Sequence, residues 1–401
     1  MPFDRQLLRA LGERYDSFYL YDESVLLRRA EALRRAFPSF SFLYSVKANS
    51  HPLVRKAMAE VGFGVDAASP REALMGAELG LDRSMIHFSA PGKTVKGLEH
   101  TLDCATIVAD SPGEVERLQT LARSRNTVVR IGVRIHPVEV PLSGVRQPSK
   151  FGVDEEAFFQ LLPRWRTLPN VRITGIHVHL KSQILDSEAL EDYYRIVFSL
   201  AQRVSDALGG SLDFLNAGSG LGIPYGPEEK PLPLASVGRT AEALCARFRQ
   251  RFPATTVFLE TGRYVAGPAG VYVTRVLDKK VSCGRTFVLL SNTLNGFLRS
   301  SIPPLAENAP APCEPLYTGQ NAVLPLPLTP RRERETVTLT GNLCTAADTV
   351  ARALSLPRLE PGDLLLFPNA GSYAAVLSPM QFSSQTPPAE LFLTRTGEVL
   401  S

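Results

Sequence analysis

The chain has 401 residues, of which 44% are hydrophobic and 21% charged, and its formal net charge is +4. This length is too great for one ordinary core and predicts a large domain with a smaller one. The composition is that of a soluble globular protein. So small a net charge, with both signs interspersed, excludes a nucleic-acid footprint, and apolar runs no longer than a strand argue against a membrane span.

The amino terminus and the cysteines set the expected compartment. Residues 1–16 alternate charged and apolar side chains and contain no signal-peptide core. The five cysteines occur singly and form no CxxC pair, so they indicate neither a zinc site nor a disulfide framework. We therefore expect a cytoplasmic protein without a bound metal.

Helical and strand-like segments alternate from residue 23 to about residue 265. Residues 23–37 carry leucines and alanines at three- and four-residue spacing, which predicts an amphipathic helix. Eight strand-like runs follow, at 42–48, 62–68, 85–90, 105–110, 128–137, 172–180, 212–218 and 256–262. Strands that alternate with helices form a parallel sheet, and eight such units predict a closed (β/α)₈ (TIM) barrel.

The sequence changes character after residue 270. Short β-rich segments separated by turns replace the amphipathic helices, which predicts an all-β domain, a sandwich or barrel-like sheet. Residues 18–22 are also strand-like, so we expect 1–22 to join 271–401 in this domain and 23–270 to form the barrel. The proline-rich stretch 303–334 is typical of an irregular insertion.

Polar or glycine-rich elements stand at the carboxyl ends of six of the eight predicted strands, where barrels of this kind collect their chemistry. In chain order they are Lys47, Asp66, Arg134 with His136, His179 with Ser182, the run Gly218 to Gly222, and the run Glu260 to Arg263. A lysine desolvated in a barrel mouth has a lowered pKa and is a good nucleophile toward an aldehyde. Taken alone, such a lysine is more often a solvated charge.

The other elements also have structural explanations when each is taken alone. The GSGLG run is either a tight turn or a nest of backbone N–H groups for a dianion. We expect His177 and His179 to face opposite ways, one in packing and the other free to stack on a ring. Glu260 either pairs with Arg263 or holds a pyridine nitrogen protonated. Together these elements predict a site for pyridoxal 5′-phosphate (PLP).

The motifs resemble those of the fold-type III PLP-dependent decarboxylases, the group of the diaminopimelate, ornithine and arginine decarboxylases, over nearly the whole chain. YSVKANS resembles the Schiff-base lysine motif, which implies that Lys47 carries the cofactor, with Asp66 nearby. HVHLKSQ (177–183) resembles H-x-H-x-G-S-Q and implies ring stacking by His179 and a phosphate contact by Ser182.

Two further motifs complete the implied cofactor site. NAGSGLG resembles the phosphate loop and implies phosphate contacts by Gly218, Ser219 and Gly220. ETGR resembles E-P-G-R, which implies that Glu260 lies at the pyridine nitrogen and that Gly262 and Arg263 lie near the phosphate.

The carboxyl-terminal part contributes three more motifs. GNLCTAAD (341–348) resembles G-P-x-C-E-S-x-D and implies that Cys344 is a catalytic thiol. GSY (371–373) resembles G-A-Y, in which the tyrosine, here Tyr373, reaches the phosphate. The resemblance implies that Cys344 and Tyr373 come from the opposite subunit of a homodimer. SNTLNGFLRSS (291–301) resembles a substrate-binding segment and implies that Arg299 grips a distal carboxylate.

Three departures from the family pattern bear on the substrate. Lys181 and Ser219 each replace a glycine, and Thr345 stands where the diaminopimelate and ornithine enzymes carry an acidic residue for the distal amine. A threonine cannot make that charge-assisted bond. We therefore predict α-decarboxylation of an acidic or amide-substituted amino acid, such as a citryl-diaminopropionate or carrier-linked substrate of a siderophore or antibiotic pathway.

Three alternatives remain open. The substrate is instead meso-diaminopimelate, ornithine or lysine if the distal end is recognised differently. An amino-acid racemase on the same architecture needs a base on each face and usually a less acidic group than Glu260. A non-catalytic PLP-binding protein would not need a second domain carrying Cys344.

Overall fold

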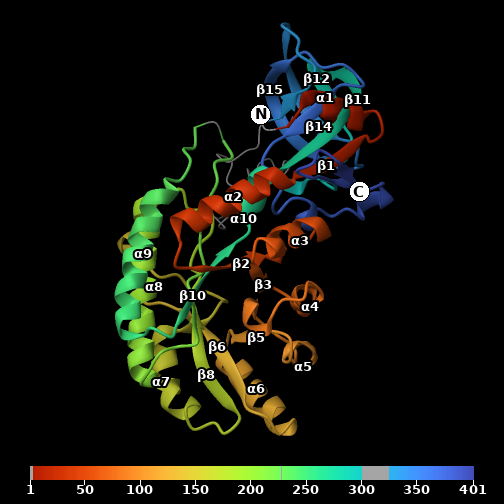
Figure 1. The fold of residues 1–401 in the computed structure, drawn as a ribbon. Helices are drawn as coiled ribbons and strands as arrows, with labels where there is room; N and C mark the ends of the chain where they lie inside the picture. Colours follow the sequence, from red (N-terminus) through yellow and green to blue (C-terminus); the bar gives the residue numbers. More distant parts are fainter. Residues whose placement is uncertain (1–2, 227, 300–324) are drawn as a thin grey trace.

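A computed structural model describes residues 3–226, 228–299 and 325–401 of the chain. Two nine-stranded sheets organise these residues, one rolled into a barrel and the other forming a separate β domain (Figure 1). Within the described ranges no helix is both long and apolar enough to cross a bilayer.

The barrel has the predicted eight parallel strands, and each lies within or close to its predicted run. They pair in the order β5-β4-β3-β2-β10-β9-β8-β6, and β5 pairs with β6 to close the ring. Their bounds are β2 Ser41–Ser45, β3 Gly64–Ala67, β4 Ile86–Phe88, β5 Thr106–Ala109, β6 Val129–His136, β8 Val171–His177, β9 Phe214–Asn216 and β10 Thr256–Thr261. The two-residue strand β7, Val153–Asp154, adds to β6 outside the ring.

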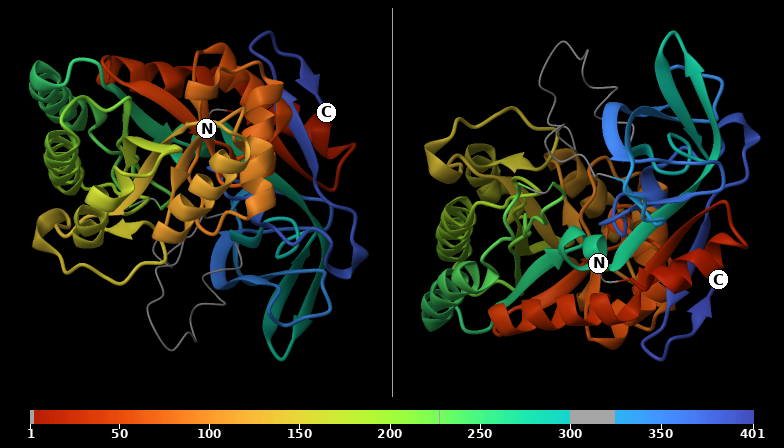
Figure 2. Two further views of the ribbon diagram at one scale, coloured as in Figure 1. Left: turned by 90° about the horizontal axis from the view of Figure 1, so that it is seen from below. Right: turned by 90° about the horizontal axis from the view of Figure 1, so that it is seen from above.

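Helices cover the outside of the barrel, and the views along its axis show them around the strands (Figure 2). Several begin with a serine or aspartate cap, as at Ser111, whose hydroxyl accepts from the amide of Glu114. The longer helices are α2 Glu23–Ala36, α3 Pro52–Glu60, α4 Pro70–Glu78, α5 Val95–Thr101, α6 Pro112–Ser124, α7 Glu155–Trp165, α8 Ser187–Leu208 and α9 Leu234–Arg251.

Aromatic side chains fill the barrel interior. The Phe214 ring packs with Phe258 and lies 4.5 Å, centroid to centroid, from the ring of His87. A Cβ at Gly132 or Gly175 would come within 2.6 or 2.3 Å of the Phe214 ring, so glycine is required at both positions. The chemistry is therefore confined to the open end of the barrel.

The second sheet contains the carboxyl-terminal strands and one strand from the amino terminus. Strand β1, Ser17–Asp22, pairs antiparallel with β11, Gly270–Ser282, and parallel with β17, Ala389–Leu393. The other strands are β12 Arg285–Leu290, β13 Leu326–Pro327, β14 Arg334–Gly341, β15 Thr349–Pro357, β16 Leu364–Phe367 and β18 Val399–Leu400. We propose the domain boundaries predicted above, because β1 joins this sheet although α2, the helix that follows it, belongs to the barrel.

A short helix, α1, Arg5–Gly12, precedes β1 in the amino-terminal segment. Asp4 caps this helix, and the three-residue spacing of Leu8 and Leu11 buries one face of it against the sheet. Of the proline-rich stretch, residues 303–324 lie outside the described ranges. The remainder contains β13 and Arg331, which forms an ion pair with Asp363.

The β domain touches the barrel where β2 ends. The amide of Tyr373 donates to the carbonyl of Ala48 over 2.8 Å. The side chain of Asn49 donates to the carbonyl of Gly371 over 2.9 Å. A loop of the β domain, residues 368–374, therefore packs directly on the turn that carries Lys47.

Candidate active site

Lys47 lies in a short 3₁₀ turn, Val46–Ala48, immediately after β2. Its ammonium forms an ion pair with the buried carboxylate of Asp66, from β3. Asp66 also accepts hydrogen bonds from Ser45, over 2.7 Å, and from Ser89, over 2.9 Å. Three neighbouring strand ends thus fix the carboxylate that holds the lysine.

The expectation that Lys47 has a lowered pKa is wrong for this structure. Burial lowers the pKa of the ammonium, but the carboxylates of Asp66 and Glu260 outweigh burial and raise the pKa above its usual value. Water still reaches the side chain, which is 41% exposed. The lysine is therefore protonated at neutral pH and must lose a proton before it can act as a nucleophile.

Glu260, at the end of β10, is buried among nitrogen donors. Its Oε1 atom accepts from the amide of Asn216 over 2.9 Å and lies 3.3 Å from Nε2 of His177. Burial raises the pKa of the carboxyl, but its contact and hydrogen bond with His177 and the charge of Lys47 outweigh burial and hold the pKa well below its usual value. Glu260 therefore stays ionised, paired with Asn216 and His177 rather than with Arg263.

The prediction that His177 and His179 face opposite ways is wrong, because residues two apart on a strand share a face. Nδ1 of His179 lies 4.0 Å from the second oxygen of Glu260, so both imidazoles flank one carboxylate. Nε2 of His179 lies 3.1 Å from the hydroxyl of Ser182. Burial lowers the pKa of His179 to about 4, which leaves a neutral ring at pH 7.

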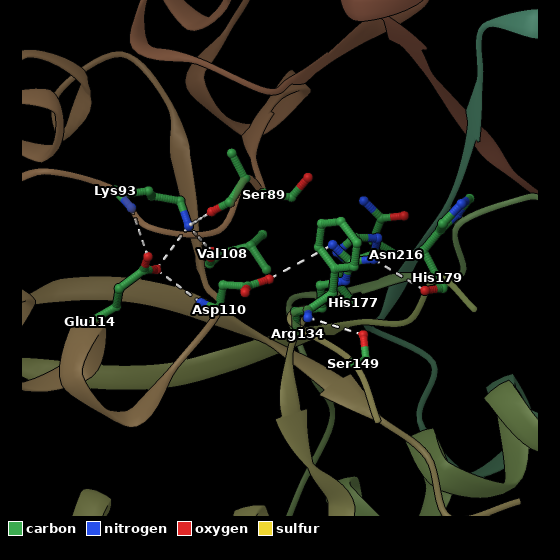
Figure 3. A network of polar contacts seen from close by, with 12 residues as sticks. Ser89, Lys93, Val108, Asp110, Glu114, Arg134, Ser149, His177, His179 and Asn216 are labelled. Atoms are coloured by element: carbon green, nitrogen blue, oxygen red, sulfur yellow. Dashed lines mark hydrogen bonds and ion pairs between the residues drawn. The ribbon is translucent and has the colours of Figure 1, made fainter. Parts of the chain in front are cut away.

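A network of buried polar side chains contacts the backbone of His179 (Figure 3). The guanidinium of Arg134 donates to the carbonyl of His179 over 3.1 Å and lies 3.7 Å from the carboxylate of Asp110. Farther from the mouth, Lys93 and Glu114 form a fully buried ion pair at 2.9 Å, and Glu114 accepts from the amide of Asp110. These charges fix the ends of β4, β5 and β6 around the site.

The glycine-rich loop after β9 packs closely against neighbouring backbone and side chains. Gly218 and Gly220 have φ angles of +56° and +80°, which L side chains rarely adopt. The side chain of Asn216 accepts from the amide of Gly218, whereas the amides of Ser219 and Gly220 donate to no group in the described part of the chain. Two buried N–H groups are thus available to an acceptor, as in a phosphate-binding loop.

Gly218→Ala should destabilise the protein and weaken phosphate binding. The new Cβ would lie 2.4 Å from the carbonyl of Val178 and 2.7 Å from the hydroxyl of Tyr193, so the loop must shift. Overpacking of this kind costs about 1–3 kcal/mol. Denaturant unfolding measures the cost, and Gly209→Ala is the control, because Gly209 has the same sign of φ but no neighbour near the added atom. Equal stability of the two variants would show that the loop shifts to accommodate the added methyl group at little cost, against this prediction.

Arg263 and Tyr373 lie together beside this loop. The guanidinium of Arg263 is buried in α10, Arg263–Ala266, and lies 4.6 Å from the ring centroid of Tyr373. The prediction that Tyr373 comes from the opposite subunit is wrong, because its amide bonds to Ala48 of the same chain. Its loop folds back onto the barrel that precedes it in sequence. Gly262 accommodates this packing, because a Cβ there would meet Ala48 at 2.7 Å.

Arg299, for which the resemblance implies a grip on a substrate carboxylate, lies beside the loop that carries Tyr373. The side chain is 3% exposed. Its Nη1 donates to the carbonyl of Asn369 over 2.8 Å, and its Nη2 donates to the carbonyls of Ser372 and Tyr373. These contacts orient the loop that carries Tyr373, and substrate binding by Arg299 stays a prediction.

Cys344 and Thr345 belong to the loop between β14 and β15. The thiol of Cys344 is exposed, and neither side chain forms a hydrogen bond or ion pair with a mouth residue in the ranges that the structure describes. Asp348 orders their loop by accepting from the amides of Leu343 and Leu294, each over 3.0 Å. The thiol is therefore held in a fixed, outward-facing loop.

Comparison with known proteins identifies the family. The family model described as pyridoxal-dependent decarboxylase, pyridoxal binding domain, matches residues 23–267. The L-glutamyl-[BtrI acyl-carrier protein] decarboxylase of Niallia circulans is 31% identical over 99% of this chain and 93% of its own. The chain belongs to the fold-type III pyridoxal-dependent decarboxylases.

Other similar proteins in this family support the same fold and activity. The diaminopimelate decarboxylase of Aquifex aeolicus is 28% identical over 98% of this chain and 90% of its own. A solved structure from Aquifex aeolicus has a TM-score of 0.81 and 27% identity, covering 98% of this chain and 90% of that one. The protein is accordingly a PLP-dependent decarboxylase, a lyase of an amino-acid-derived small molecule.

The residues at the mouth of the decarboxylase fit PLP. Lys47 offers an amine, Glu260 a buried anion for the pyridine nitrogen, and His179 a neutral ring for stacking. The unpaired amides of Ser219 and Gly220 and the guanidinium of Arg263 suit a phosphate dianion. The ends of four strands, β2, β8, β9 and β10, bring these groups together.

Sequence reasoning missed several groups that the structure places beside the decarboxylase site. Tyr225 lies against two arginines, and the Lys93–Glu114 pair supports the strand ends. The only sequence signal for Tyr225 is its place just after the GSGLG run. A buried lysine and glutamate that are 21 positions apart give no such signal.

Proposed function

We propose that this decarboxylase acts on an amino acid whose distal end is an acid or an amide rather than a free ammonium. The single observation that carries the proposal is the uncharged Thr345 next to Cys344, where related diaminopimelate and ornithine enzymes carry an acidic residue. A distal ammonium buried without a carboxylate partner loses a charge-assisted bond and keeps its desolvation cost. Such substrates are therefore disfavoured.

The relatives give this proposal independent support. The Niallia circulans relative is named for a glutamyl group on an acyl-carrier protein, and it matches 99% of this chain. An acyl group on a carrier protein is held as a thioester, so a glutamyl group linked through its side-chain carboxyl has no free amine at its distal end. We propose a substrate of this class, carrier-linked or citryl-substituted, from an antibiotic or siderophore pathway, with meso-diaminopimelate as the alternative suggested by other relatives.

The site residues divide the chemical work. Bound PLP supplies a ring that accepts the electron pair left when the substrate loses CO₂. Glu260, ionised and buried, would keep the pyridine nitrogen protonated, and neutral His179 would lie against the ring. Lys47 would hold the cofactor after it gives its proton to Asp66 or to water. Ser219, Gly220 and Arg263, with Ser182 beside His179, would hold the phosphate.

We propose that two copies of the chain share their active sites. Cys344, in the fixed outward-facing loop, would protonate the substrate carbon in the partner's site, and Thr345 would line the distal end of that pocket. The exposure of the thiol and its separation from the mouth of its own barrel support this arrangement. We propose that the dimer works in the reducing environment of the cytoplasm, where its singly spaced cysteines would stay free thiols.

A CO₂-release screen of purified protein tests the substrate class. A charge-assisted pair is worth about 1.5–3 kcal/mol, or roughly one to two decades in rate. We therefore expect kcat/KM for carrier-linked or amide-substituted glutamate to exceed that for meso-diaminopimelate, ornithine and lysine by about that factor. Thr345→Glu should shift the preference toward the diamino acids.

The control for that substitution is Thr345→Gln, which has the shape of glutamate without its charge. Thr345→Gln should lower turnover of every substrate alike, whereas Thr345→Glu should raise the relative rate of diamino acids. Wild-type turnover of meso-diaminopimelate or ornithine above that of every acidic and amide candidate would establish the alternative substrate class. The cofactor spectrum of each variant shows whether the site is intact.

A further inference from the structure

Tyr225 lies between two buried arginines next to the phosphate loop. Its ring is 7% exposed, and its hydroxyl accepts a hydrogen bond from Nη1 of Arg263 over 2.8 Å. The guanidinium of Arg299 lies over the same ring, 4.6 Å from its centroid. One tyrosine of the barrel domain therefore contacts an arginine of its own domain and an arginine of the β domain.

The contacts of the two arginines close a ring of interactions around the site. Arg263 lies over the ring of Tyr373, and Arg299 donates to the carbonyls of Ser372 and Tyr373. The side chain of Asn369 donates in turn to the carbonyl of Pro224, beside Tyr225, over 3.0 Å. The loop that carries Tyr373 and the segment that carries Tyr225 are thus joined by both arginines and by the hydrogen bond from Asn369 to Pro224.

The backbone around Tyr225 is itself fixed. The carboxylate of Glu229 accepts from the amides of Tyr225 and Gly226, over 2.6 and 3.0 Å. The side-chain amide of Gln183 exchanges two hydrogen bonds with the backbone of Ile223, at 2.6 and 3.2 Å. Tyr225 is therefore presented from a rigid segment, so its hydroxyl can define where the Arg263 guanidinium lies.

We propose that Tyr225 is a positioning residue of the cofactor-phosphate site, which holds Arg263 in the orientation that meets the phosphate. An arginine side chain loses conformational entropy when a bound ligand fixes it in one orientation. Because the hydrogen bond to Tyr225 already fixes Arg263 before the phosphate binds, that entropy cost no longer reduces the affinity. The role concerns the phosphate end of the cofactor and is independent of the amino-acid substrate.

The electrostatics of the tyrosine agree with this geometry. Burial raises the pKa of Tyr225, but the charges of Arg299 and Arg263 outweigh burial and hold the pKa below its usual value. The phenolic oxygen therefore lies in a positive field, in agreement with the hydrogen bond that it accepts from Arg263. Phenylalanine would keep the ring under Arg299 and remove the hydroxyl, which also lies near Ser372.

Binding of PLP and of pyridoxal to the cofactor-free full-length protein tests the proposal, because the two ligands differ only in the phosphate. Tyr225→Phe should weaken PLP about tenfold and leave the affinity for pyridoxal within about twofold of wild type. Inorganic phosphate should also compete less well with PLP in the variant. Unchanged PLP affinity, or equal losses for PLP and pyridoxal, would overturn the proposal.

Two further variants separate positioning from general stability. In an Arg263→Ala background the tyrosine has no guanidinium to hold, so adding Tyr225→Phe should cause no further loss of PLP affinity. Additive losses would show that Tyr225 acts by another route. Tyr264→Phe is the matched control, because Arg29 lies 3.6 Å from the ring centroid of Tyr264 and that pair is no part of the contacts described here. It should bind both ligands like wild type.

Discussion

Lys47→Ala should abolish covalent cofactor attachment and lower turnover by on the order of 10³-fold, because the lysine both holds PLP and moves protons at the reacting carbon. The wild-type protein should be yellow, and borohydride should fix the cofactor on the peptide that contains Lys47. The variant should lose both signals while its phosphate loop remains intact. Absorption spectroscopy and mass spectrometry of the reduced protein measure them.

A second lysine of the barrel, Lys93, is the internal control for this assignment. Lys93 is a second lysine near a strand end of the same barrel, and its side chain is completely buried against Glu114. Burial lowers the pKa of Lys93, which by itself is a property expected of a nucleophile. Its amine donates to the carbonyls of Ala90 and Val108 at 2.6 Å, however, and is held away from the mouth. Borohydride labelling of Lys93 would refute the assignment of Lys47.

The raised pKa of Lys47 adds a pH dependence to this result. Only the neutral amine attacks the aldehyde, and Asp66 and Glu260 stabilise the ammonium form. Below the pKa, the neutral fraction grows about tenfold for each pH unit. The rate at which the cofactor-free protein takes up PLP should therefore rise with pH through the neutral range. Asp66→Asn, which lowers the lysine pKa, should raise the neutral fraction and the uptake rate at each pH. Stopped-flow absorbance follows the uptake.

The barrel and the residues at its mouth could be predicted from local patterns. Each strand is a short apolar run that can be recognised in the sequence. Residues at the carboxyl ends of such runs lie at the same end of a barrel, so Lys47, Asp66 and Glu260 could be placed together. The contacts of Arg299 and Tyr373 could not, because they depend on how a loop some 70 residues farther along folds back. The protonation of Lys47 likewise depends on two carboxylates brought in by other strands.

Cys344→Ala should retain bound PLP yet lower turnover by about 10²–10⁴-fold, the range typical of a missing proton donor. The thiol is exposed in a loop ordered by Asp348 and has no bond to the mouth of its own barrel within the described ranges. We therefore expect it to act in the site of a neighbouring copy, as proposed above. Cys283→Ala, which alters another exposed thiol, should leave turnover unchanged.

Mixing the two inactive proteins tests whether the site is shared. In a dimer with one Lys47→Ala subunit and one Cys344→Ala subunit, one of the two sites combines an intact lysine with an intact thiol, and the other lacks both. Random exchange of equal amounts makes half of the dimers hybrid, so activity should recover to about a quarter of wild type. Subunit exchange must be shown separately, by mass or by fluorescence energy transfer. Exchange without recovery would place the thiol in the site of its own chain, and full activity of Cys344→Ala alone would remove it from the chemistry.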